Sequence, residues 1–413
     1  MTISMRIRLS LMLFLEYFIW GAWYVTLGTW LAQSLHFSGE QIGLAAGTTA
    51  LGGIVSPFLV GFVADRLAAT QRLLAVLHGM GAVLLYFASR QTEFAGLYWI
   101  VLLYCLFFMP TLSLTNSLAF RHMTDPQTQF GSIRVMGTLG WIVAGLLVGT
   151  MRVEATAIPM QLAAASSALM AIYALTLPHT PPVAAATEWS FSSIFPREAV
   201  RLLADRSVAV FAIASFLICI PLQFYYAFTN LFLNQRGVVN AAGKMTGGQM
   251  SELGFMLLLP LFFRRLGVKY MLVVGMLAWV IRYVLFAYGN STSLVWMFWV
   301  GILLHGICYD FFFVTGQIYI DQKASPHLRA AAQGLITFLT YGVGMFVGSW
   351  LSGYIVQHYS TVVNGEPAYD WRTIWLFPAG FAAVVLVMFM AFFSERKQIG
   401  AEEPALSASA TPV

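Results

Sequence analysis

Acidic side chains inside apolar stretches are the first candidates for chemistry in this sequence. Asp310 is the one formally charged residue within residues 294–320, and Glu252 and Glu16 lie in two other apolar stretches. A carboxylate deep in a bilayer costs several kcal/mol, so it is tolerated where it faces a bundle interior or a wet cavity. Since such a group can take up and release a proton, Glu252, Asp310 and Glu16 are predicted to carry protons. For Glu16 the alternative is a structural ion pair with Arg134.

Polar and aromatic residues recur at helical spacing in the same kind of stretch. One stretch has Arg134, Thr138 and Trp141 at i, i+4 and i+7, and a second has Gln223, Tyr226 and Asn230 at i, i+3 and i+7. A third has Gln249 and Glu252 at i and i+3, and a fourth has His305 and Tyr309 at i and i+4. Residues so spaced share one face of a helix, which predicts the walls of a central cavity. Alternatively, they hydrogen-bond neighbouring helices for about 0.6 to 2 kcal/mol each, and Arg282 pairs with an acid such as Asp310.

The predicted cavity has a characteristic set of chemical groups. Its aromatic faces come from Trp141, Tyr226 and Tyr309, and its amide donors and acceptors from Gln223, Asn230 and Gln249. Glu252 supplies one carboxylate. Flat rings stack on aromatic faces, amides bind donor and acceptor edges, and a carboxylate accepts from sugar hydroxyls. A nucleoside has all three features. A sugar would use the same groups with less stacking, so these residues alone leave both substrates open.

Composition places these stripes on membrane-spanning helices. Of the 413 residues, 59% are hydrophobic and 9% are charged, whereas soluble domains have about 25% charged residues. The basic residues form no run or stripe, which argues against a nucleic-acid partner. Apolar runs of about 20 residues are long enough to span a bilayer. Twelve are predicted, near 9–31, 42–64, 73–89, 96–120, 133–151, 157–178, 208–233, 243–263, 270–289, 294–320, 331–357 and 372–393.

A polar segment between the sixth and seventh runs divides the chain. Residues 1–178 are predicted to form an N-terminal six-helix bundle and residues 208–393 a C-terminal six-helix bundle. Residues 179–207 between them are predicted to be a cytoplasmic linker, and residues 394–413 a disordered cytoplasmic tail. A basic hairpin follows the second run of each half, which indicates two parallel repeats. With both termini in the cytoplasm, fifteen of the 22 Lys and Arg residues fall on that side and five on the other. This distribution satisfies the positive-inside rule.

Several motifs resemble those of the nucleoside:proton symporters of the major facilitator superfamily, along essentially the whole chain. They are Trp20-Gly-Ala-Trp23, residues 109–116, Ile133-Arg-Val-Met-Gly-Thr-Leu-Gly-Trp141, Gln249-Met-Ser-Glu252, Tyr309-Asp-Phe311 and Arg329-Ala-Ala-Ala-Gln-Gly334. The resemblance implies an all-α membrane protein with twelve helices in two pseudo-symmetric halves. It further implies a proton-coupled secondary transporter that imports nucleosides across the bacterial inner membrane by alternating access, without a cofactor or metal, and as a monomer.

The resemblance also implies roles for individual residues. The family positions that match Arg134, Thr138, Trp141, Gln223, Tyr226, Gln249, Glu252, His305 and Tyr309 line the nucleoside site, and the position matching Asp310 is tied to proton coupling. Asp65 and Arg66 resemble the superfamily's cytoplasmic hairpin motif and are expected to act as a gate. Trp141, Tyr226, His305 and Tyr309 differ from a characterised family member, which leaves the preferred nucleobase open.

Other functions remain to be weighed against nucleoside import. A sugar:proton symporter or a multidrug exporter would use the same fold. A membrane receptor or enzyme is a further class, but the sequence has no nucleophile, base and acid set and no metal-ligand cluster. Its three cysteines lie singly in apolar runs, so no disulfide framework is indicated. A transporter, not an enzyme, is therefore predicted.

Overall fold

The computed structural model describes residues 1–59, 69–182, 197–326, 328–363 and 366–394. The predicted gate residues Asp65 and Arg66, and the predicted tail beyond Ser394, lie outside these ranges. Helices dominate the described chain: α1 Ile3–Trp23, α2 Leu27–Gln33, α3 Gly39–Leu59, α4 Thr70–Ala88, α5 Phe94–His122, α6 Pro126–Met151, α7 Ile158–Ala174, α9 Arg197–Arg201, α10 Arg206–Gln235, α11 Ala241–Tyr288, α12 Val295–Cys308, α13 Thr315–Lys323, α14 Arg329–Thr337, α15 Met345–His358 and α16 Trp371–Phe392. Strands β1 Ser360–Val363 and β2 Glu366–Tyr369 form an antiparallel hairpin between α15 and α16.

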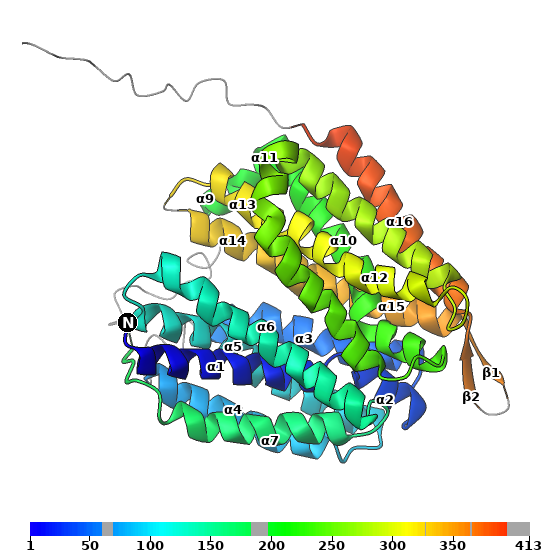
Figure 1. Ribbon diagram of the computed structural model, residues 1–413, viewed down its shortest axis with the longest axis horizontal. Helices are drawn as coiled ribbons and strands as arrows, with labels where there is room; N and C mark the ends of the chain where they lie inside the picture. Colours follow the sequence, from blue (N-terminus) through cyan, green and yellow to red (C-terminus); the bar gives the residue numbers. More distant parts are fainter. Residues whose placement is uncertain (60–68, 183–196, 327, 364–365, 395–413) are drawn as a thin grey trace, which may run out of the picture.

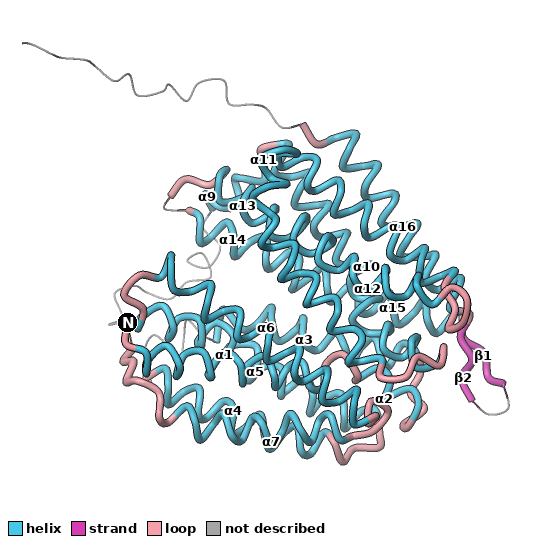
Figure 2. Tube along the Cα trace, viewed as in Figure 1, coloured by secondary structure: helices cyan, strands magenta, loops and turns pink. Residues whose placement is uncertain are grey.

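Each predicted apolar run overlaps a helix. In the described part of the chain, nine helical segments are long and apolar enough to cross a membrane, and Ile158–Ala174 is a shorter apolar helix. Loops and turns gather at the two ends of the helices (Figure 2). This arrangement keeps irregular backbone away from the apolar middle, where its polar groups would be unsatisfied.

Helix α11 contains two of the predicted runs. Its 48 residues would extend about 72 Å if straight, more than twice the roughly 30 Å of a bilayer core. Gly267 interrupts it with φ 68° and ψ 175°, a conformation that glycine adopts without the cost of a Cβ. Figure 1 shows α11 as two arms joined by a sharp bend. The predicted hairpin between the eighth and ninth runs is thus a sharp break within one helical element.

The helices form two groups that lie side by side (Figure 1). Helices α1 to α7 form the first group and α10 to α16 the second. At the end near the β-hairpin the groups touch through α2 and α10, α3 and α15, and α6 and α11. We call this the closed end. At the other end, where the N terminus lies, an open cleft separates α5 from α14; we call it the open end.

Two membrane segments change to π-helix near the middle of their length. The first is Tyr309–Val314, between α12 and α13, and the second is Phe338–Gly344, between α14 and α15. A π-turn inserts one residue per turn and occurs often at functional sites. Predicted site residues Tyr309 and Asp310 begin the first of these π-helices.

Asp205 caps the N terminus of α10 outside the membrane segments. Its carboxylate accepts hydrogen bonds from the backbone N–H groups of Ser207 and Val208 at 2.8 and 3.2 Å. Burial acts to raise its pKa, but these bonds and the nearby Lys323 outweigh burial and lower the pKa below its usual value.

We expect Asp205→Ala to lower the free energy of unfolding by about 1 kcal/mol at neutral pH, because the cap is lost. A lowered native pKa stabilises the fold above the unfolded-state pKa, and this contribution disappears as the pH falls through the native value. Melting curves of purified parent and variant should therefore differ at neutral pH and converge in acid. A constant difference at all pH values would contradict this explanation.

Candidate functional site

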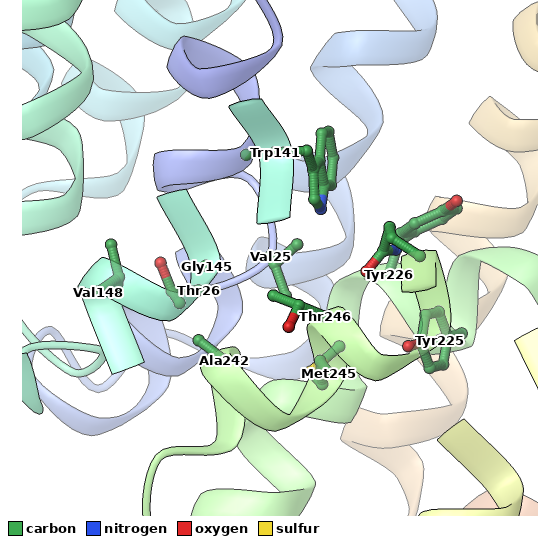
Figure 3. A pocket seen from close by; sticks show the side chains of 12 residues that line it. Val25, Thr26, Trp141, Gly145, Val148, Tyr225, Tyr226, Ala242, Met245 and Thr246 are labelled. Atoms are coloured by element: carbon green, nitrogen blue, oxygen red, sulfur yellow. The ribbon is translucent and has the colours of Figure 1, made fainter. Parts of the chain in front are cut away.

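A narrow pocket lies between the two groups of helices (Figure 3). Its walls come from α1 and α6 of the first group and from α10 and α11 of the second. The predicted residues Trp141, Tyr226 and Gln249 line it, together with residues that sequence reasoning did not select: Gly21, Val25, Thr26, Gly145, Val148, Tyr225, Ala242, Met245 and Thr246. A ligand here would contact both groups at once.

Aromatic rings form one side of this pocket. The ring centroids of Trp20 and Trp141 are 5.5 Å apart in an edge-to-face arrangement, and those of Tyr24 and Tyr226 are 5.8 Å apart. A Cβ on Gly21 would lie 3.0 Å from the Cα of Trp141, so glycine lets α1 and α6 approach closely enough to place these rings. Rings at such distances offer faces on which a flat heterocycle can stack.

Helix α1 contributes an aromatic face that sequence reasoning missed. Tyr17, Trp20 and Tyr24 follow the spacing i, i+3, i+7, and successive rings lie 6.3 and 5.9 Å apart. The same spacing selected Gln223, so the signal was present in the sequence. Trp20 Nε1 has no hydrogen-bond partner among the described residues, which leaves a donor beside the aromatic wall.

Arg134 and Glu252 lie on opposite groups and face the same region. The guanidinium of Arg134 stacks over the ring of Tyr17, 4.2 Å from its centroid. Glu252 is close enough for its charge to interact with Arg134 and with the Tyr309 hydroxyl. That hydroxyl also accepts a hydrogen bond of 2.9 Å from Tyr341. The structure therefore brings Arg134, Glu252 and Tyr309 into one region, but none of them lines the pocket of Figure 3.

Asp310 is fully buried, with 0% of its surface exposed. Neither carboxylate oxygen has a hydrogen-bond partner among the described residues, and Glu252 is the acid whose charge reaches it. A charged carboxylate buried in this way costs free energy unless it gains a partner, and a bound proton removes that cost. The described surroundings of Asp310 therefore favour the protonated, uncharged form of its carboxyl group.

The predicted pairing of Arg282 with Asp310 is wrong. Arg282 Nη1 instead lies 3.1 Å from His305 Nδ1, and its guanidinium stacks over Tyr225 at 3.5 Å from the ring centroid. Ring contacts continue from His305 to Tyr226, at 6.2 Å between centroids. His305 therefore supports the aromatic wall from behind, and Arg282 fixes its orientation.

The alternative pairing of Glu16 with Arg134 is also wrong. Glu16 is fully buried; Oε2 lies 3.0 Å from His78 Nε2, and Oε1 accepts a 2.5 Å hydrogen bond from Thr111. His78 Nδ1 is in turn 3.3 Å from the Ser167 hydroxyl. This network joins α1, α4, α5 and α7 inside the first group, away from the pocket.

Two further predicted residues have different surroundings. Thr138 is half-buried on α6, one turn from Arg134 and within a turn of Trp141. Gln223 is fully buried on α10, and both polar atoms of its amide lack a hydrogen-bond partner among the described residues. The Tyr24 hydroxyl lies near this amide, and an amide left unpartnered in a buried position costs about 1 to 3 kcal/mol.

Titratable residues do not gather as metal ligands in the described ranges. No group of three or more His, Cys, Asp or Glu side chains there is placed to hold a metal ion. The site's chemistry consists of stacking, amide hydrogen bonds and the charges of Arg134, Glu252 and Asp310.

Comparisons with known proteins agree with this geometry. The family model described as "Nucleoside H+ symporter" matches residues 1–398. A protein of Escherichia coli K12 named "Putative nucleoside transporter YegT" is 44% identical over 400 residues, covering 94% of this chain and 93% of the relative. The xanthosine permease of the same organism is 34% identical, covering 94% and 96%. The crystal structure of the nucleoside transporter NupG superposes with a TM-score of 0.86 at 31% identity, covering 95% of this chain and 100% of that one. The resemblance predicted from the sequence is confirmed, and the chain belongs to the nucleoside H+ symporter family.

Proposed function

We propose that this protein imports nucleosides together with protons across the bacterial inner membrane by alternating access. One observation carries the proposal: a pocket with aromatic and amide side chains receives its walls from both groups of helices. A substrate that contacts both groups stabilises the state in which they approach each other, which couples binding to movement.

In the proposed complex, the nucleobase stacks against Trp141 and Tyr226 while Gln249 hydrogen-bonds its edge. Gln223 and Tyr309 supply further polar contacts, and Glu252 accepts from the ribose hydroxyls. Arg134 and Thr138 approach from the first group, and His305 supports Tyr226. A relative named for xanthosine makes purine nucleosides a necessary part of any substrate panel.

The proposed topology has twelve membrane spans in two pseudo-symmetric halves. Residues 1–178 and 208–393 form the halves, 179–207 the cytoplasmic linker and 394–413 the cytoplasmic tail. The excess of Lys and Arg on one side supports cytoplasmic termini. In this orientation the open end faces the cytoplasm and the described state is inward-facing. We propose a monomer, since both walls of the pocket come from one chain.

Proton coupling supplies the energy for accumulation. One proton that enters through about 150 mV releases about 3.5 kcal/mol, enough to sustain a few-hundredfold gradient of a neutral solute. We propose Glu252 and Asp310 as the proton-binding residues of the second half, and Glu16, paired with His78, as that of the first.

The deciding experiment is uptake by proteoliposomes with an imposed pH gradient. We expect labelled uridine or a purine nucleoside to accumulate when the outside is acidic, and accumulation to stop when a protonophore is added. Labelled sugars under the same conditions are the control. Accumulation of sugars without nucleosides would favour a sugar symporter, and binding without uptake would favour a receptor.

The proton role of Glu16 gives a separate prediction. We expect Glu16→Gln to change the pH dependence of uptake, because the His78 pair loses the group that exchanges a proton. The measurement is initial uptake rate against external pH, with melting temperature recorded for the same preparations. Ser167→Ala, which also alters a contact of His78 but keeps both titratable groups, is the matched control. A variant with lower stability and an unchanged pH profile would show that the Glu16–His78 pair is structural.

A further inference from the structure

Glu154 lies in the turn between α6 and α7, at the closed end of the first group, and is 4% exposed. All of its recorded hydrogen bonds go to the second group. Oε2 accepts from the side-chain amides of Asn230 and Asn234, at 2.9 and 2.7 Å, and Oε1 accepts from the backbone N–H of Ala242 at 3.1 Å. One buried carboxylate therefore bridges the two groups through three donors.

The donors are arranged to receive a negative charge. Ala242 is in the first turn of α11, where backbone N–H groups are free and the helix dipole is positive. The Asn230 amide is oriented by Thr29 of α2, whose hydroxyl donates to Asn230 Oδ1 at 2.5 Å, so its NH₂ group points at Glu154. Hydrogen bonds to a charged acceptor are about twice as strong as neutral ones. The bridge is thus a preformed binding site for one carboxylate.

This bridge lies directly next to the pocket. Asn230 follows the pocket residue Tyr226 by one helical turn, and Thr29 follows the pocket residue Thr26 by three positions. Ala242 lines the pocket itself. Glu154 and its donors therefore lie at the closed end, next to the pocket.

Around the bridge the two groups of helices pack closely, backbone against backbone, and we call this contact surface at the closed end the seam. A Cβ on Gly43 of α3 would lie 2.4 Å from the carbonyl oxygen of Ser349 on α15, and one on Gly28 of α2 would lie 2.2 Å from the carbonyl oxygen of Ala227 on α10. Gly39 N donates to the Gln357 side chain at 2.8 Å. These contacts close the seam mainly by shape complementarity, and they are joined by a few hydrogen bonds such as that of Gly39.

We propose that Glu154 is a latch that holds the two groups together at the closed end and must release in every transport cycle. This inference rests on the alternating-access import and the orientation proposed above, which make the closed end periplasmic. When the seam opens, water replaces the three donors, so release is reversible. Glu154 touches no lining atom except through Ala242, and it acts on transport as a positioning residue.

The test is the accessibility of the seam, read without any substrate. A single cysteine in place of Ala227, which is 4% exposed, reports on the seam in protein whose buried Cys105, Cys219 and Cys308 are changed to alanine. We expect Glu154→Ala to raise the rate of labelling by a water-soluble maleimide about tenfold or more, the change expected when hydrogen bonds to a buried charge are lost. Glu93→Ala, which removes an exposed acid at the start of α5, is the matched control and should label at the parental rate.

A second variant separates a latch from a general loss of stability. Asn234→Ala removes the donor at 2.7 Å and should also speed labelling, while adding it to Glu154→Ala should have little further effect, because both changes break one interaction. Melting temperatures identify variants that are unfolded. Equal labelling rates in parent, Glu154→Ala and Asn234→Ala would overturn the latch, as would fully additive effects. Because labelling needs no substrate, failure of nucleoside import would not alter this readout.

Discussion

Replacing Asp310 by asparagine, or Glu252 by glutamine, is expected to abolish uphill nucleoside uptake. Asp310 is fully buried with both oxygens unpartnered, and Glu252 is close enough to interact with both Asp310 and Arg134. A proton bound at Asp310 relieves the repulsion between the two acids and leaves Glu252 with Arg134. An amide cannot carry that proton, so the few-hundredfold gradient that one proton sustains would collapse.

Uptake and exchange must be measured on the same proteoliposomes. We expect the variants to lose accumulation driven by a pH gradient but to keep counterflow exchange, since exchange needs no net proton movement. Asp370→Asn is the matched control: Asp370 caps α16, and asparagine is also a good cap. If Asp310→Asn and Glu252→Gln both accumulate nucleoside with the parental pH dependence, neither residue carries the proton.

Removal of the aromatic wall is expected to produce the second large effect. Trp141 lines the pocket and packs edge-to-face against Trp20. Loss of base stacking costs about 1 to 3 kcal/mol, so Trp141→Ala should weaken nucleoside binding roughly 5- to 150-fold. Trp99→Ala is the control, because Trp99 is 65% exposed on the outside of the bundle. Isothermal titration with a nucleoside panel gives both affinities, and equal affinities would place the binding site elsewhere.

Gln223 and Tyr309 test the polar part of the same site. Gln223 is buried without a partner, so Gln223→Ala should leave the melting temperature equal or higher while weakening nucleoside binding at least fivefold. Tyr309→Ala should weaken binding by a similar factor, because it removes a ring and a hydroxyl that interacts with Glu252. Parental affinity for every nucleoside in both variants would show that substrate does not reach these residues.

Local periodicity identified helix faces that the structure brings to one pocket. The apolar runs became helices because their length and composition match a bilayer. The stripe ending at Trp141 and those containing Tyr226 and Gln249 converged on one pocket because residues at i, i+3, i+4 and i+7 share a face whatever surrounds the helix. The position of Asp310 inside an apolar run likewise predicted that this acid is buried, without any information on its neighbours.

Only the tertiary structure decided which charged groups meet. Periodicity determines which residues share one face of a helix. It determines neither the direction in which that face points nor the distance between neighbouring helices. Glycines that admit a neighbouring backbone, such as Gly21 against Trp141, fix that separation. As a result Glu16 pairs with His78 instead of Arg134, and Arg282 contacts His305 instead of Asp310. Glu154 lies in a turn, where the sequence has no periodic pattern. Its partners Asn230, Asn234 and Ala242 belong to a segment about 80 residues away along the chain. No local spacing in the sequence predicts that these two segments approach each other.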